Sequence, residues 1–220
     1  MDWLSAFQQA SNNMQTANAI RNQQALSNDA AEKRQLEEFQ KAIDAGDPAA
    51  MNDYGLWLYQ SGNRELGLEF LTKSSIAGQT EALSSFTWFS LKNGNHQDAI
   101  TLYKACRVKL KFGDTPYQLA NCDSNFWLNN LALGGSEKDA EKAWLINGAK
   151  SNHTESLFFP IVLMHKAKNF KMRDEYASKL KKQQWKEMSD EMLEEQMTST
   201  GWFKKWCHDA YEMISELGKS

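Results

Sequence analysis

The sequence predicts an all-α fold, a solenoid of stacked antiparallel helical hairpins with an extra N-terminal helix and a C-terminal capping helix. The 220 residues are 41% hydrophobic and include only three prolines, with abundant Ala, Leu, Lys, Glu and Gln, which favours helices over strands. Much of the pattern from Gly46 to Ala82 recurs 32 residues later, so that Trp57 corresponds to Phe89. Repeats of about 20 to 50 residues are typical of stacked units that bury their apolar faces against their neighbours.

Residues 1–44 form an arm whose composition differs from that of the remaining chain. The arm is rich in Gln and Asn and carries little charge over its first half. Apolar side chains four and three residues apart form one stripe along a predicted helix: Trp3, Phe7, Ala10, Met14 and Ala17. Three interpretations stay open, namely a helix that packs on a partner or a second copy, a frayed tail, or an export address. The first of these makes a self-assembling scaffold, associating through residues 1–44, a second hypothesis for the function.

Residues 45–183 carry clear signals for helix starts and ends. Asp47 can accept hydrogen bonds from the first free amides of a helix, and Pro48 suits the first helical position. Gly62, Gly78 and Gly94 can adopt the left-handed conformation that ends a helix. We therefore expect helices over residues 48–60, 64–77, 80–92, 95–110, 116–133, 137–150, 154–168 and 170–183. Short connections should make successive helices antiparallel neighbours.

Two later features depart from the regular repeat. Ala99 and its counterpart Ala140 are 41 residues apart rather than 32, which places nine extra residues between Val108 and Asn121. Insertions in repeat proteins usually lengthen a connection, often on the binding face. Pro160 lies within an apolar segment, where it should kink a buried helix or mark its late start.

The last segment, residues 184–220, is expected to form a helical cap. Its apolar side chains share one face of a helix that begins near Gly201: Trp202, Trp206, Ala210, Met213, Ile214 and Leu217. A terminal amphipathic helix of this kind covers the apolar end of a repeat array. We therefore assign this segment a structural role.

The repeat resembles the Sel-one-like family, a relative of the tetratricopeptide repeats. In the first unit the matching residues are Ala50, Tyr54-Gly55, Gly62, Leu66-Gly67, Phe70-Leu71, Lys73-Ser74-Ser75 and Gly78. The second unit keeps Ala82, Gly94, Ala99, Leu102-Tyr103 and Lys104-Ala105-Cys106. Thr87 replaces its middle glycine. The resemblance covers residues 45–110 most fully and residues 111–183 loosely.

In this pattern Gly55 and Gly67 should face each other and let two helices approach closely, while Phe70 and Tyr103 fill the space toward the next unit. By resemblance, the chain is expected to be a non-catalytic adaptor, scaffold or inhibitor of other proteins. Similar bacterial repeats occur in cell-envelope regulators and in immunity proteins that block secreted toxins.

In the related repeats, the first helix of each pair lines a concave surface. Carried over by position, this nominates eight partner-binding residues: Asn52, Leu56, Tyr59, Ser84, Trp88, Leu91, Asn125 and Asn129. Aromatic anchors flanked by amides suit a bound peptide or helix. The competing interpretation is that these side chains belong to the packed interior. The first hypothesis is therefore a module that binds a partner protein or peptide in a concave groove, as a bacterial adaptor or a toxin-neutralising immunity protein.

The charge balance disfavours a dedicated nucleic-acid binder. The formal net charge is −3, whereas contacts to phosphates require a basic face. The segment from Lys166 to Lys186 nevertheless holds eight basic residues, so RNA binding there is a third hypothesis. The acidic residues that follow, from Glu187 to Glu195, are interpreted as a solvated helix face.

The apolar segments are too short to cross a membrane. No stretch approaches 18 apolar residues, so we expect no membrane span. The start of the sequence lacks the basic segment and the long apolar run of a secretory signal. This predicts a cytoplasmic protein, or a periplasmic one if a signal peptide has been removed.

Neither catalysis nor a cofactor or metal is indicated by the sequence. The four histidines show no metal-ligand spacing. Cys207 and His208 are adjacent, but neighbouring side chains on a helix diverge by about 100° and do not form a nucleophile and base pair. Three cysteines form no disulfide pattern, and a bridge between Cys106 and Cys122 would need an oxidising compartment.

Overall fold

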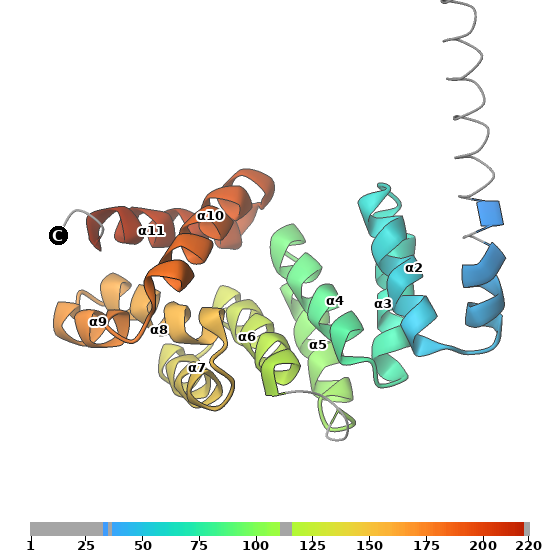
Figure 1. Cartoon of the computed structure of the whole chain (residues 1–220), viewed down its shortest axis with the longest axis horizontal. Helices are drawn as coiled ribbons and strands as arrows, with labels where there is room; N and C mark the ends of the chain where they lie inside the picture. Colours follow the sequence, from blue (N-terminus) through green and yellow to red (C-terminus); the bar gives the residue numbers. More distant parts are fainter. Residues whose placement is uncertain (1–32, 35–36, 111–115, 218–220) are drawn as a thin grey trace, which may run out of the picture.

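The computed structural model describes residues 33–34, 37–110 and 116–217, and all regular structure within these ranges is helical (Figure 1). The helices are α2 (Pro48–Gln60), α3 (Arg64–Ile76), α4 (Thr80–Asn93), α5 (His96–Cys106), α6 (Pro116–Ala132), α7 (Glu137–Ser151), α8 (Thr154–Lys166), α9 (Phe170–Ala177), α10 (Lys182–Thr198) and α11 (Gly201–Leu217). Residues 37–44 are helical as well. The predicted all-α class is confirmed for this part of the chain. Most of the predicted arm, residues 1–44, lies outside the described residues.

Most helices begin and end within two residues of the predicted positions, because local signals fix them. Asp47 accepts a hydrogen bond from the Ala49 amide at 2.9 Å, and Pro48 is the first residue of α2. Gly94 ends α4 with φ at 79°, in the left-handed region that favours glycine. The predicted start and end signals of these helices thus form the expected hydrogen bonds and backbone angles.

Helices α5 and α9 end earlier than predicted. After Cys106 the chain turns tightly, with the Leu110 amide bonded to the carbonyl oxygen of Arg107. After Ala177 the amide of Leu180 bonds in the same manner to the Ala177 carbonyl oxygen. Both turns place a leucine in the interior, with Leu110 1% and Leu180 8% exposed. Burial of these side chains therefore outweighs the local tendency to continue the helix.

Each helix from α2 to α8 packs against the next one along the chain. Helix α6 also contacts α4 on one side and α8 on the other. Figure 1 shows this row of helices running from α2 in cyan through α6 in yellow-green to α9 in orange. Helices that lead the expected units, α4, α6 and α8, are therefore direct neighbours.

Two glycines allow α2 and α3 to pack closely. A Cβ atom added to Gly55 would lie 3.0 Å from the carbonyl oxygen of Gly67. One added to Gly67 would lie 2.8 Å from both the carbonyl oxygen of Gly55 and the amide nitrogen of Tyr59. A methyl group cannot approach backbone atoms this closely without moving them. The predicted face-to-face placement of the two glycines is confirmed.

The two aromatic residues expected between units behave differently. Tyr103 of α5 stacks on Phe126 of α6, with ring centroids 4.1 Å apart, and so fills the space toward the next unit as predicted. Phe70 of α3 packs edge-on against Tyr54 of α2 at 5.0 Å. Phe70 thus contacts an aromatic ring of its own hairpin, in the edge-to-face geometry that aromatic pairs prefer.

The interior of the described residues contains two apolar clusters. The smaller one joins α3, α4, α5 and α6 around Leu71, Leu83 and Cys106. The larger one joins α4, α6, α7, α8, α9, α10 and α11, and its largest fully buried rings are Trp144, Trp206, Phe158, Phe159 and Phe203. Each of these rings removes enough apolar surface from water to stabilise the fold by about 2–3 kcal/mol. Pro160 is buried inside α8, so this helix does not begin at the proline.

The C-terminal helices fold back over the middle of the chain. Helix α11 buries one face, as predicted, and the fully or nearly fully buried residues on it are Phe203, Trp206, Cys207, Ala210 and Met213. It packs against both α8 and α4, while α10 packs against α8 (Figure 1). The larger apolar cluster therefore continues across the predicted boundary at residue 184. The C-terminal segment was predicted to cover the end of the helical array, and in the structure it also covers the central helices α4 and α8.

A polar contact joins α4 to the end of α10. Lys92 Nζ lies 2.9 Å from Glu195 Oε2, and these two residues are 103 positions apart in the sequence. The hydroxyl of Thr200 donates a hydrogen bond to the carbonyl oxygen of Lys92 at 3.0 Å. Trp88, one turn before Lys92, meets Phe203 of α11 edge-on. These contacts close a ring of helices around the site described next.

Candidate functional site

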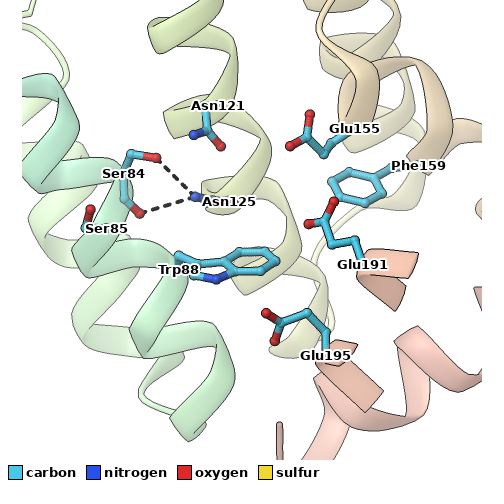
Figure 2. A pocket seen from close by; sticks show the side chains of 9 residues that line it. All are labelled: Ser84, Ser85, Trp88, Asn121, Asn125, Glu155, Phe159, Glu191 and Glu195. Carbon is cyan, nitrogen blue, oxygen red and sulfur yellow. Dashed lines mark hydrogen bonds between the residues drawn. The ribbon is translucent and has the colours of Figure 1, made fainter. Parts of the chain in front are cut away.

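A pocket of about 310 Å³ opens between α4, α6, α8 and α10 (Figure 2). The side chains that line it are Ser84, Ser85, Trp88, Asn121, Asn125, Glu155, Phe159, Glu191 and Glu195. The lining thus combines carboxylates, amides and hydroxyls with two aromatic rings. The volume is at the lower limit of typical small-molecule sites, so a single side chain or a small ligand can fill it.

Helical spacing brings these side chains to one place. Each of the four helices supplies a pair of lining residues that are four positions apart: Ser84 and Trp88 from α4, Asn121 and Asn125 from α6, Glu155 and Phe159 from α8, and Glu191 and Glu195 from α10. Residues four apart lie on the same face of a helix, one turn above the other. Four helices therefore each direct one short stripe into a common space.

Two asparagine side chains of α6 form hydrogen bonds to the backbone of α4. Asn125 Nδ2 donates to the carbonyl oxygen of Ser84 at 3.2 Å, and Asn129 Nδ2 donates to that of Thr87 at 3.0 Å. His96 Nδ1 lies 3.0 Å from Asn129 Oδ1. The two asparagines thus bond the backbone of this chain rather than that of a bound peptide. Asn125 Oδ1 accepts no hydrogen bond from the described residues and stays open to solvent.

Glu191 is the most perturbed acid in the pocket. Burial is the main cause that raises its pKa from 4.5 to about 8, and the charges of Glu155, Glu195 and Glu194 raise it further. Neither a hydrogen bond nor an ion pair joins its carboxyl to any described residue. The carboxyl therefore holds its proton at neutral pH, at a site where a carboxylate would lack a counter-charge.

Glu155 stands beside a buried neutral imidazole. His153 Nε2 lies 3.1 Å from Glu155 Oε2, but the two atoms do not form a hydrogen bond. Burial is the main cause that lowers the pKa of His153, with the charge of Glu155 acting in the opposite direction. His153 Nδ1 accepts a hydrogen bond from the Ser156 amide at the start of α8. The histidine is therefore a structural cap, and Glu155 has no Lys or Arg partner among the described residues.

Glu195 differs from the other two acids because it is paired. Only 7% of the residue is exposed, and both of its carboxylate oxygens lie within 3.0 Å of Lys92 Nζ. Ser199 Oγ adds a hydrogen bond of 2.9 Å. Such a buried pair needs these additional bonds to offset the loss of hydration. Lys92 is thus engaged by Glu195 and is not bonded to Glu155 or Glu191.

Three of the eight nominated partner-binding residues line the pocket together: Ser84, Trp88 and Asn125. Leu91 and Asn129 are 0% exposed, so neither side chain can reach a partner. The physical reason is that α4 and α6 use these positions to pack against their neighbours. On α4 and α6, some of the nominated residues therefore line the pocket, while others are buried in the interior.

The three nominated residues of α2 lie outside this pocket. Asn52 is 4% exposed. Leu56 is half-buried against the smaller apolar cluster. Tyr59 stacks on Phe89 of α4, with ring centroids 3.8 Å apart, and its hydroxyl accepts a hydrogen bond from Asn93 Nδ2. Tyr59 therefore holds α2 against α4, and none of the three side chains lines the pocket.

Sequence reasoning missed the acidic side of the pocket. The segment from Glu187 to Glu195 was expected to be a solvated face, and Glu187 and Glu194 are indeed exposed. Glu191 and Glu195 instead face inward with Met188 and Met192, which are 2% and 0% exposed. The four-residue spacing of these methionines and acids was a signal that they share the packed face.

Three of the eight basic residues from Lys166 to Lys186 are paired with acids. Lys166 lies 3.1 Å from Asp209, Arg173 lies 2.6 Å from Asp174, and Lys179 lies 3.9 Å from Glu175. These contacts reduce the positive charge that the segment presents to solvent.

The cysteine and histidine positions give no nucleophile and base pair. Cys106, Cys122 and Cys207 are buried free thiols. Burial is the main cause that raises the pKa of Cys207, and the neighbouring His208 side chain is 48% exposed. In the described ranges, no three His, Cys, Asp or Glu side chains are arranged to hold a metal ion. The same ranges contain no helix that is both long enough and apolar enough to cross a membrane.

Comparisons of the chain with protein-family models, with curated proteins and with solved structures find no match. Functional inference therefore rests on the site.

Proposed function

We propose that this protein is a non-catalytic interaction module that binds a segment of a partner protein at the face formed by α4, α6, α8 and α10. The observation that carries the proposal is the open pocket of about 310 Å³ at the centre of this face. Trp88 forms part of its wall and is half-buried. Half-buried tryptophans in such hollows are the typical anchors of protein interfaces.

The proposed architecture is a stack of helical hairpins over residues 45–183, of the Sel-one-like kind. Its support is the packing of each helix on the next and the contacts of α6 with α4 and α8. Such an array presents the first helices of its units on one surface. The resemblance implies an adaptor or a toxin-neutralising immunity protein, which would act by occluding its partner.

A binding role fits the pocket better than a catalytic one. Ser84 Oγ lies 3.4 Å from the amide nitrogen of Asn125, a group that cannot accept a proton as a base. Glu195 is held by Lys92. The pocket thus offers recognition groups, while no nucleophile in it is bonded to a histidine or carboxylate.

Site-specific photo-crosslinking tests the proposed face. Benzoylphenylalanine at Ser85 would point a reactive group into the pocket, and the same group at Thr101, exposed on α5, is the control. We expect one discrete partner segment to be captured from the Ser85 position only. Capture from both positions, or from neither, would contradict the proposal.

A binding measurement with the purified partner completes this test. Trp88→Ala should weaken the affinity by about thirtyfold or more, as expected for an interface anchor worth about 2 kcal/mol. Trp127→Ala is the matched control, since Trp127 is half-buried on α6 outside the pocket. If both variants bind as tightly as the wild type, the partner does not use this face.

A further inference from the structure

The pocket contains more carboxyl groups than cations. Glu155, Glu191 and Glu195 line it, and within the described ranges the Lys or Arg side chain bonded to any of these acids is Lys92, which pairs with Glu195. Neither Glu155 nor Glu191 has a Lys or Arg partner among the described residues. Carboxyl groups that are partly shielded from water and have no Lys or Arg beside them favour a cationic occupant, whose charge also favours their ionised form.

The residues that line the pocket beside the acids suit a cation with a planar or aliphatic part. Figure 2 shows Trp88 extending from α4 toward the acids of α10, with Phe159 beside Glu155 and Glu191. An indole ring attracts a cation over its face. Asn125 lines the same space, and its Oδ1 accepts no hydrogen bond from the described residues. A free acceptor in the pocket wall suits an occupant that donates hydrogen bonds.

Arginine fits this combination better than a metal ion or a lysine does. A divalent metal binds several oxygens at about 2.0–2.6 Å, and the acids in the described residues are not grouped in that manner. A lysine ammonium is compact and strongly hydrated, whereas a guanidinium is planar, stacks on aromatic rings and carries five donors. An arginine side chain also has an apolar stem that can lie against Trp88 and Phe159.

We propose that this pocket receives an arginine side chain of the partner, with its stem against Trp88 and its guanidinium between Glu155 and Glu191. This inference rests on the proposed function, because it assigns the chemistry of the segment bound at the same face. The partner is thus expected to present a basic residue on an extended or helical segment. Burial without a counter-charge raises the pKa of Glu191 to about 8, and an adjacent guanidinium lowers it again.

The test uses the full chain and three short peptides. These are the acetylated, amidated peptide Gly-Ala-Arg-Ala-Gly and its versions with citrulline or lysine in place of arginine. Citrulline keeps the shape of arginine but has no charge. Binding is followed by the shift of the Trp88 indole N–H signal in ¹⁵N-labelled protein, which Trp88→Phe identifies among the eight tryptophans. We expect the arginine peptide to bind at least tenfold more tightly than the citrulline peptide.

Variants of the acids connect this binding to the pocket. Glu155→Gln and Glu191→Gln should each weaken binding of the arginine peptide about tenfold, since each removes one charged hydrogen-bond acceptor. Glu187→Gln is the matched control, because Glu187 is exposed one turn earlier on α10. Equal losses in all three variants would show only a long-range charge effect and would overturn the proposal.

Other outcomes of the titration also decide the question. If the citrulline peptide binds as tightly as the arginine peptide, charge does not contribute to recognition. If the lysine peptide binds as tightly, the pocket does not select arginine. If calcium chloride or spermidine shifts the Trp88 signal at lower concentrations than the arginine peptide does, the pocket binds a metal ion or a polyamine and the proposal of an arginine is overturned. If a crosslinked partner segment is found but its arginines can be changed without loss of affinity, this inference fails while the proposed function stands. If the arginine peptide binds but no partner segment is captured from Ser85, the proposed function fails.

Discussion

Glu191→Gln is expected to remove a loss of stability at alkaline pH. The pKa of Glu191 rises from 4.5 to about 8 on folding, chiefly through burial. The folded protein therefore keeps a proton that the unfolded chain releases between these pH values. Because the folded-state pKa is the higher one, the contribution to stability is complete below about pH 4.5 and is lost as the pH rises through about 8. Glutamine reproduces the shape of the protonated acid and does not titrate.

The magnitude follows from the difference between the two pKa values. The full difference corresponds to about 5 kcal/mol, at about 1.4 kcal/mol for each pH unit. The titratable and charged groups around the carboxyl are Lys92 of α4, Tyr117 of α6, Glu155 of α8, Glu194 and Glu195 of α10 and Cys207 of α11. The charges of Glu155, Glu195 and Glu194 supply part of the shift in the Glu191 pKa, so the measured energy is expected to be smaller than the full value. We expect the variant to match the wild type near pH 5 and to be more stable by about 2–4 kcal/mol near pH 8.5.

Urea unfolding followed by far-ultraviolet circular dichroism measures this difference. The free energy of unfolding of the wild type and of the variant is determined at half-unit steps from pH 5 to pH 8.5. Glu187→Gln serves as the control, since this exposed residue removes the same charge from the same helix. Its curve should stay parallel to that of the wild type. If the Glu191→Gln curve is also parallel to the wild type, Glu191 is not a buried neutral acid and the electrostatic description of the pocket is wrong.

Two further substitutions test the packing that forms the fold and the site. Gly67→Ala should lower the free energy of unfolding by at least about 2 kcal/mol, measured by urea, because the new methyl group would meet two backbone atoms at 2.8 Å; an unchanged value would contradict the close approach of α2 and α3. Lys92→Met should cost about 3 kcal/mol by leaving the buried carboxylate of Glu195 unpaired. Adding Glu195→Gln to Lys92→Met should restore much of this loss, and a failure to do so would mean that the pair does not join α4 to α10.

The helices could be predicted from the sequence because their ends are fixed by neighbouring residues. Asp47 and Pro48 start α2, and Gly94 ends α4, through bonds and angles that involve only a few positions. The ends of α5 and α9 could not be predicted in this way. They depend on Leu110 and Leu180 entering the interior, which is a tertiary effect.

The partner-binding residues were predicted only in part because one helix face performs two tasks. Trp88 and Leu91 lie three positions apart on α4, yet Trp88 lines the pocket and Leu91 is 0% exposed. Position in a repeat gives the helix and its approximate face, but not the depth of each side chain. That depth depends on where α11 lies, since Phe203 of α11 packs on Trp88.

The acidic wall could not be predicted from the repeat because a repeat implies contacts between adjacent units. Lys92 and Glu195 are 103 positions apart, and their contact exists only because the C-terminal helices return to α4. Glu191 is not the most stable choice at its position. Its carboxyl is partly buried without a counter-charge, whereas a glutamine would fill the same space without an ionisation cost. Packing therefore does not explain the carboxyl, whereas a cationic side chain of a partner would. Places where a chain departs from the most stable choice are where function is expected, and in the described part of this chain Glu191 marks such a place.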